Sequence, residues 1–124
     1  MIQRISSGSK YEPIVGYSRA VVAGPYVEVA GTTAPHAGDT AYAQAKGALE
    51  IIGAALAAAG VTFADVIRTR IFVTDITQWE EVGRAHGEVF ADVRPVTTMV
   101  EVSALIDPSI LVEIEATAYR GPQS

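Results

Sequence analysis

The chain of 124 residues has no cysteine, only one tryptophan and few basic residues. Without cysteine it can form neither a disulfide nor a catalytic thiolate, and we expect a cytoplasmic protein. The nine Lys and Arg residues are outnumbered by 14 Asp and Glu residues, which gives a net charge of −5, and they form no basic run. Because a nucleic-acid-binding surface depends on clustered cations, we expect no nucleic-acid partner.

Long apolar runs are missing as well. Residues 53–61 form the longest weakly polar stretch, which is rich in alanine and too short to cross a bilayer. The N-terminus has no basic segment followed by an apolar one, so we expect neither a signal peptide nor an association with a membrane. Apolar residues still make up 49% of the chain, which suits a single domain over residues 1–124 with one core.

Motifs for cofactors and metals are also absent from the sequence. No glycine-rich phosphate-binding loop follows a predicted strand, and no Gly-x-Ser-x-Gly elbow is present. His36 and His86 lie far apart, and neither has other metal ligands at the usual spacing. We therefore expect no cofactor and no bound metal.

The periodicity of the apolar residues predicts an α+β fold. The six predicted strands cover residues 2–6, 17–22, 26–32, 66–74, 96–102 and 110–119. The two predicted helices cover residues 39–59, with a cap at Asp39 or Thr40 and Gly60 after the end, and 77–91. Two amphipathic helices of this kind usually cover one face of one sheet, so we predict a six-stranded mixed sheet with both helices on the same face.

The second predicted helix begins with the capping-box spacing of Thr77-Gln78-Trp79-Glu80. Its predicted inner stripe consists of Trp79, Val82, His86, Val89 and Phe90. We interpret His86 on this stripe as a structural core residue with a satisfied ring nitrogen.

The sheet face without helices is predicted to mix charged and large apolar side chains. Its predicted members are Arg68, Arg70, Phe72, Thr97, Met99, Glu101, Leu111, Glu113, Glu115 and Tyr119. Such a face is either an oligomer interface or a ligand site between subunits, or a solvated face with scattered large side chains.

Glu113 is the strongest candidate for chemistry on this face. Beside apolar neighbours its carboxylate would be partly desolvated, which would raise its pKa and suit a proton shuttle or a water-activating base. The alternative is a structural glutamate paired with Arg68, Arg70 or a lysine of a partner.

The C-terminal strands resemble those of the RidA/YjgF family, formerly called L-PSP endoribonucleases or translation inhibitors. The most specific match is the pairing of Val100-Glu101-Val102 with 112–116, and the resemblance extends over residues 17–119. It implies a chorismate-mutase-like homotrimer that binds small molecules in pockets between subunits. It also implies that Glu113 positions or activates water and that Tyr17 and Gly31 line the pocket.

The chain departs from the family pattern at Thr97. Family enzymes carry an arginine three residues before Val-Glu-Val, and in deaminating members it binds the carboxylate of a small imino or enamino acid. Threonine offers one neutral hydrogen bond, and losing a charged one, worth about 1.5–3 kcal/mol, would weaken binding by about 10- to 100-fold or more. Arg70 is the better substitute for this cation, because Arg94 has the opposite strand parity. Gly83 stands where family enzymes often have an asparagine.

We therefore interpret the chain as a homotrimeric, cofactor-independent Rid-family protein that is not a typical 2-imino acid deaminase. As an enzyme it would hydrolyse or tautomerise an imine, an enamine or a related small metabolite. Glu113 would be the catalytic residue, and the pocket would be shaped by Tyr17, Gly31, Thr97 and Thr98. The alternative is a non-catalytic small-metabolite-binding or scavenging protein. A ribonuclease activity is suggested only by the old family label, and the acidic charge balance argues against it.

Overall fold

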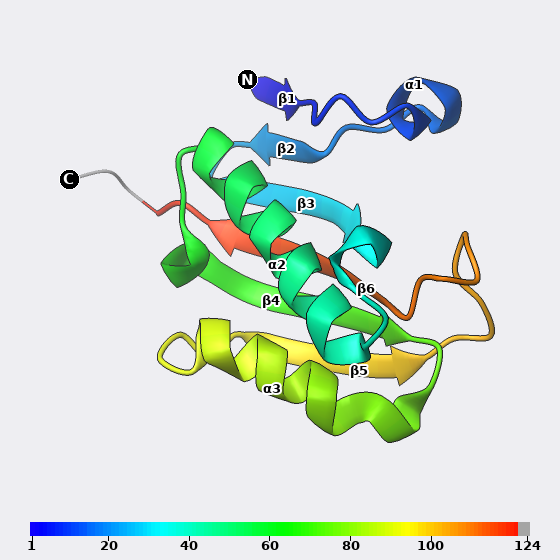
Figure 1. Cartoon of the computed structure of the whole chain (residues 1–124). Helices are drawn as coiled ribbons and strands as arrows, with labels where there is room; N and C mark the ends of the chain where they lie inside the picture. The colour runs from blue at the N-terminus through cyan, green and yellow to red at the C-terminus, as the bar shows by residue number, and fades with distance from the viewer. Residues whose placement is uncertain (122–124) are drawn as a thin grey trace.

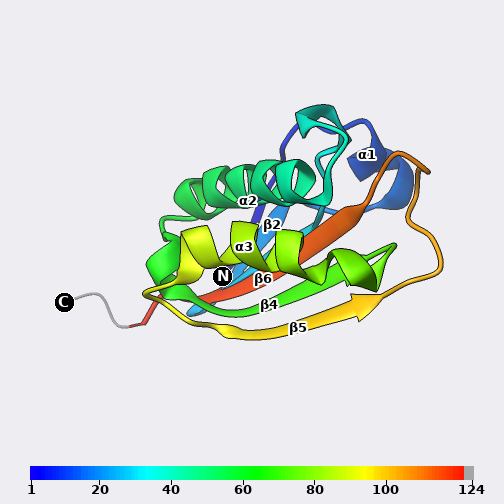
Figure 2. The ribbon, with the colours of Figure 1, turned by 60° about the horizontal axis from the view of Figure 1, so that its bottom comes forward.

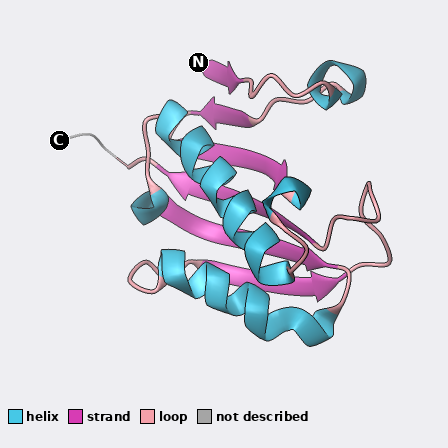
Figure 3. Cartoon of the chain, in the orientation of Figure 1, coloured by secondary structure: helices cyan, strands magenta, loops and turns pink. Residues whose placement is uncertain are grey.

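A six-stranded sheet with two long helices on one face forms the core of the computed structural model, which describes residues 1–121 (Figure 1). The strands are β1 (Ile2–Ile5), β2 (Ala20–Ala23), β3 (Tyr26–Thr32), β4 (Val66–Val73), β5 (Val96–Glu101) and β6 (Val112–Tyr119). The helices are α1 (Tyr11–Val15), α2 (Ala41–Ala58) and α3 (Trp79–Phe90), with 3-10 turns η1 (Pro35–Ala37), η2 (Phe63–Asp65) and η3 (Ile76–Gln78). The predicted α+β fold is confirmed, and the short helix α1 is an element that the sequence pattern did not predict (Figure 3).

The strand order in the sheet is β1-β2-β3-β6-β4-β5, and only the β4–β5 pair is parallel. The last strand in the sequence therefore lies between β3 and β4. Side chains of β6 alternate strictly in burial, and those on the helix side are Val112, Ile114, Ala116 and Ala118. Figure 2 shows α2 and α3 together on that side, which leaves the other face of the sheet without helices. We call this second face the open face.

Helix α2 packs closely on the sheet because its buried side is built from alanine together with Leu49, Ile52 and Leu56. Of the two predicted candidates, Asp39 and Thr40, it is Thr40 that caps its start, since its side chain accepts a hydrogen bond from the Ala43 backbone N–H. The chain leaves the helix at Gly60, whose φ of +82° lies in the left-handed region that favours glycine. Among the described residues, no helix is long and apolar enough to cross a membrane.

The predicted start of α3 is wrong. Asp75, rather than Thr77, supplies the side chain that accepts hydrogen bonds at the turn into this region, and it begins η3. Gln78 precedes α3 without a side-chain cap, and Trp79 is the first residue of the helix with 55% of its surface exposed. Trp79 therefore does not belong to the buried stripe of α3, which consists of Val82, Ala85 and Phe90.

The predicted face of β5 is also wrong. In the parallel pair with β4, Thr98 lies opposite Arg70 and Val100 opposite Phe72, and residues opposite each other project to the same face. Thr98 therefore lies on the open face, whereas Thr97, Met99 and Glu101 project to the helix side. Alternation within a strand defines two faces, but only the pairing register decides which face of one strand continues which face of the next.

Gln44 ties α2 to the loop that precedes β6. Its side chain is only 2% exposed. Its Nε2 donates hydrogen bonds to the carbonyl oxygens of Gly38 (3.0 Å) and Ser109 (2.9 Å), and its Oε1 accepts one from the Leu111 N–H (2.8 Å). These three bonds fix the chain where it enters the central strand.

Gln44→Ala should lower the free energy of unfolding by about 2–4 kcal/mol, because three backbone groups lose their partners and each unsatisfied buried group costs about 1–3 kcal/mol. Chemical denaturation measures this loss. The exposed Gln78 offers a matched control, and Gln78→Ala should change stability by no more than about 0.5 kcal/mol. Equal effects at the two positions would contradict the role given to Gln44.

Candidate functional site

Helix α1, the end of β3 and the loop before β6 lie at the same end of the sheet (Figure 1). Residues of these segments line a cavity of about 690 Å³. Its walls come from segments far apart in the sequence: residues 7–19, the end of β3 with the following loop, Ile51 of α2, and residues 106–113. Tyr17, Gly31 and Glu113 all line this cavity. The structure thus brings three of the predicted site residues together within one subunit.

Glu113 lies on the open face of β6, directly against the backbone of β3. The pairing of β3 with β6 is irregular between Val29 and Thr32, and Gly31 lies in this bulge. A Cβ atom on Gly31 would overlap Glu113 Oε2 and would lie 3.0 Å from its Cδ. Only glycine therefore leaves room for the carboxylate at this position.

The carboxylate of Glu113 is half-buried. No described residue forms a hydrogen bond or an ion pair with it, and Arg70 pairs with Glu115 instead at 3.3 Å. Burial is the main cause that raises the pKa of Glu113, the neighbouring charge of Glu115 raises it further, and Arg19 opposes them. An ionised carboxylate whose pKa is raised in this way is a stronger base than an exposed one.

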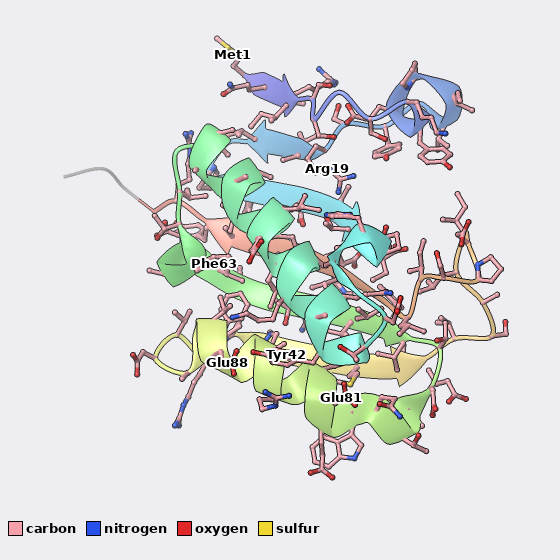
Figure 4. All side chains as sticks on the ribbon, in the orientation of Figure 1. Met1, Arg19, Tyr42, Phe63, Glu81 and Glu88 are labelled. Atoms are coloured by element: carbon pink, nitrogen blue, oxygen red, sulfur yellow. The ribbon has the colours of Figure 1, made fainter. Side chains whose placement is uncertain are left out.

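Arg19 is a cavity residue that the sequence pattern did not reveal. Only 9% of its surface is exposed, and it lies just before β2 on the side of α1 (Figure 4). Its Nη1 donates hydrogen bonds to the carbonyl oxygens of Ala30 (3.4 Å) and Gly31 (3.2 Å) and to Thr32 Oγ1 (2.6 Å). The guanidinium therefore holds the bulge of β3. The available signal in the sequence was a charged arginine next to the apolar residues 20–22 of a predicted strand.

The two arginines that were predicted to supply a cation lie outside this cavity. Arg70 lines a smaller neighbouring hollow of about 340 Å³ on the open face, together with Glu115 and Tyr17. Arg94 lies in the turn after α3, where its φ is +54° and its Nε donates a hydrogen bond to the Ala91 carbonyl at 3.2 Å. Tyr17 is therefore the only predicted site residue shared by both cavities among the described residues.

Thr97 and Thr98 lie on the edge strand β5, two strands and roughly 10 Å away from β6. The Thr97 hydroxyl is 2.8 Å from Thr69 Oγ1 and 3.5 Å from His86 Nε2, and that nitrogen is 2.9 Å from Thr69 Oγ1. The His86 ring also lies 4.6 Å from the ring of Phe90, and burial lowers the pKa of His86. Near neutral pH, Thr97 is thus part of an uncharged polar cluster, and a ring nitrogen of His86 is satisfied as predicted.

Three comparisons identify proteins similar to this chain. The family model described as "Endoribonuclease L-PSP" matches residues 7–120. The "Uncharacterized protein SCO2049" of Streptomyces coelicolor is 44% identical over 97% of the chain and 93% of its own length, and the human "2-iminobutanoate/2-iminopropanoate deaminase" is 31% identical over 98% and 93%. The crystal structure of Rv2704 from Mycobacterium tuberculosis, a YjgF/YER057c/UK114 family member, superposes with a TM-score of 0.93 at 58% identity over 96% of this chain and 99% of that one. This similarity confirms the predicted chorismate-mutase-like fold.

Glu113→Gln should make the protein more stable near pH 7. The pKa of Glu113 is raised in the folded state, so ionisation of this carboxyl favours unfolding, and glutamine cannot ionise. The advantage of the variant should shrink as the pH falls and disappear below about pH 4, where the folded and unfolded states both keep the proton. Thermal unfolding across this pH range measures the effect.

Glu50→Gln, at an exposed carboxylate of α2, is the matched control and should change stability by at most about 0.5 kcal/mol. If Glu113→Gln instead lowered stability near pH 7, the carboxylate of Glu113 would be making a stabilising pairing, as in the structural interpretation of this residue.

Proposed function

Because the chain belongs to the endoribonuclease L-PSP family, also called the RidA/YjgF family, we propose that it is a cofactor-independent hydrolase of a small imine or enamine. The observation that carries this proposal is the unpaired, half-buried carboxylate of Glu113 in a cavity beside Gly31 and Tyr17. A human relative named as a deaminase of 2-iminobutanoate and 2-iminopropanoate supports the reaction class.

The proposed reaction needs one water molecule and one base. Glu113 takes a proton from water while the oxygen attacks the imine carbon. Glu113 passes this proton to the nitrogen, which gives a carbinolamine. The carbinolamine hydroxyl then gives up its proton, which reaches the nitrogen by way of Glu113 while the C=O bond forms and the C–N bond breaks, and a carbonyl compound and ammonia or an amine are left. The raised pKa of Glu113 suits both steps, since the same carboxyl can accept a proton from water and return it to the leaving nitrogen.

We further propose that the protein is a homotrimer whose open faces pack against one another, with ligand pockets between subunits. Exposed apolar side chains on this face support the assembly: Val96, Val100, Tyr26 and Tyr119 are 41–58% exposed. The two tyrosines pack edge to face, with ring centroids 5.4 Å apart. Within one subunit Thr97 lies two strands away from Glu113 and projects to the helix side, so a contact between position 97 and the Glu113 cavity would have to come from the edge strand of a neighbour.

The proposed substrate differs from that of a typical 2-imino acid deaminase. Where family enzymes carry the arginine that binds the substrate carboxylate, this chain has Thr97, whose hydroxyl is engaged by Thr69. The neighbouring His86 is uncharged near neutral pH because burial lowers its pKa.

This neutral cluster of Thr97, Thr69 and His86 also favours a second candidate function, a non-catalytic protein that binds or scavenges a small metabolite. Loss of turnover in Glu113→Gln, with binding retained, would distinguish the enzyme from the binding protein.

Light scattering at micromolar concentration should return a mass of three 13.0 kDa subunits. Val100→Asp, which places a charge on the open face, should shift the protein towards smaller species because burying an unpaired charge is costly. Ile14→Asp, at a 75% exposed position of α1, is the control and should leave the mass unchanged. A mass near one subunit for the unmodified protein would contradict the trimer.

The unmodified protein should hydrolyse 2-iminobutanoate and 2-iminopropanoate only weakly, because Thr97 cannot bind their carboxylate by an ion pair. Thr97→Arg should raise this turnover by about tenfold or more, the value of a charge-assisted hydrogen bond. A coupled assay in which a dehydratase generates the imine, with 2-keto acid release as the readout, measures the rates.

Glu113→Ala in the Thr97→Arg background should abolish the gain. Ala91→Arg adds a cation at an exposed position after α3 and should produce no gain, which controls for a general effect of charge. Strong activity of the unmodified protein on these imines would show that our interpretation of Thr97 is wrong.

A further inference from the structure

We infer that Arg19 is an anion-recognising residue of the Glu113 cavity, so that the ligand carries a carboxylate or a similar small anionic group on the side of Tyr17. This inference rests on the proposed function for the location of the site and adds the charge class of its ligand. Arg19 would determine which ligand charge the cavity accepts. An arginine at position 97 would instead determine how a ligand carboxylate is positioned relative to the attacked carbon.

The first observation is the burial of an unpaired charge. Arg19 is 9% exposed, yet no described carboxylate forms an ion pair with it. The exposed arginines Arg70 and Arg84, by contrast, pair with Glu115 at 3.3 Å and Glu88 at 4.0 Å. Buried charges in folded proteins are normally paired, because removing an ion from water without compensation is costly. A ligand anion is the partner that this guanidinium lacks.

The second observation is how the hydrogen bonds of Arg19 are distributed. Nη1 alone makes the three bonds to the bulge of β3. Among the described residues, neither Nη2 nor Nε has an acceptor, and Nε is closed to solvent. A purely structural arginine that supports the bulge would account for Nη1 and leave the other two nitrogens unexplained. Nη2 is the nitrogen left to meet a ligand.

The third observation is that the cavity places Arg19 among groups suited to a small organic anion. Tyr17 lies over the guanidinium, with Cζ 5.8 Å from the ring centroid, and Val15, Ile51 and Ile106 contribute apolar wall. The other charged residue of the wall besides Glu113 is Asp107, whose carboxylate is bound by the N–H and hydroxyl of Ser109. Asp107 is thus already engaged locally, and Arg19 is the cation that remains for a ligand.

Butyrate and butyramide test this inference, because they have nearly the same shape and differ in charge. We would titrate each into the full chain at pH 7.5 and follow backbone amide chemical shifts. Butyrate should bind about tenfold or more tightly than butyramide, with the largest shifts around Tyr17, Arg19 and Gly31. Arg19→Gln should remove the preference, and Arg19→Lys should keep part of it.

Two further variants test the effect of the Glu113 charge and the specificity of the effect of Arg19. Glu113→Gln should strengthen butyrate binding several-fold, because it removes a like charge from the cavity. Arg84→Gln removes an arginine of α3 that lies over the Tyr42 ring and pairs with Glu88, and it should leave the preference for butyrate unchanged. Tyr42 and Glu88 are labelled in Figure 4, far from Arg19.

Equal binding of the two probes, no butyrate binding at millimolar concentration, or a preference that survives in folded Arg19→Gln would each overturn the inference. If Arg19→Gln fails to fold, the inference is still tested by two measurements: the preference of the unmodified protein for butyrate over butyramide, and the change in butyrate affinity in Glu113→Gln. A clear preference for butyrate without any imine turnover would refute the proposed hydrolase and leave the role of Arg19 standing. Imine turnover without a preference for butyrate would support the proposed hydrolase and refute the role of Arg19.

Discussion

The close approach of the Glu113 carboxylate to the backbone at Gly31 is the contact on which the geometry of the site depends. It requires a residue without a side chain at position 31, and this residue lies in the bulge of β3. The bulge in turn leaves carbonyl oxygens outside the regular strand pairing, and the Nη1 of Arg19 binds two of them. A glycine, a bulge and a buried arginine thus meet the Glu113 carboxylate at the end of β3.

The central strand β6 links this site to the stability of the whole fold. Its helix-side residues are fully buried in the core, and its alternate residues Glu113, Glu115 and Thr117 project to the open face. Because a strand fixes its side chains at intervals of two residues, the core that holds Ile114 in place also fixes Glu113. The bonds of Gln44 to the chain on either side of Ile110 anchor the start of this strand. The carboxylate that we propose as the base is therefore held by rigid packing rather than by a mobile loop.

Local patterns in the sequence were sufficient to predict the six strands, the two long helices, a cap of α2 at Asp39 or Thr40, the exit from α2 at Gly60 and the position of Glu113 on the face away from the helices. They were insufficient where the answer depends on contacts between distant segments. The face of β5 follows from its register with β4, and the sequence of β5 carries no information on that register. The bulge at Gly31 and the role of Arg19 depend on how β3 meets β6, a strand more than 80 residues later in the chain. The start of α3 was misplaced because Asp75 and Thr77 both suit a cap, and only the structure shows which one accepts the hydrogen bonds.

The positions of charged and neutral side chains around the site indicate from which side a ligand would be held. The position at which family enzymes hold a substrate carboxylate is occupied by a neutral cluster of Thr97, Thr69 and His86, and these three residues satisfy one another. The only cation in the wall of the Glu113 cavity, among the described residues, is Arg19, which comes from the opposite end of the chain. In the proposed reaction Glu113 lies beside the attacked carbon, so a ligand anchored at Arg19 would extend from Glu113 towards Tyr17 and α1, and not towards β5 of a neighbour in the proposed trimer. If Glu113 activates water as we propose, it would then act on a molecule held from the other side, and the fold would keep its reaction class while its substrate changes.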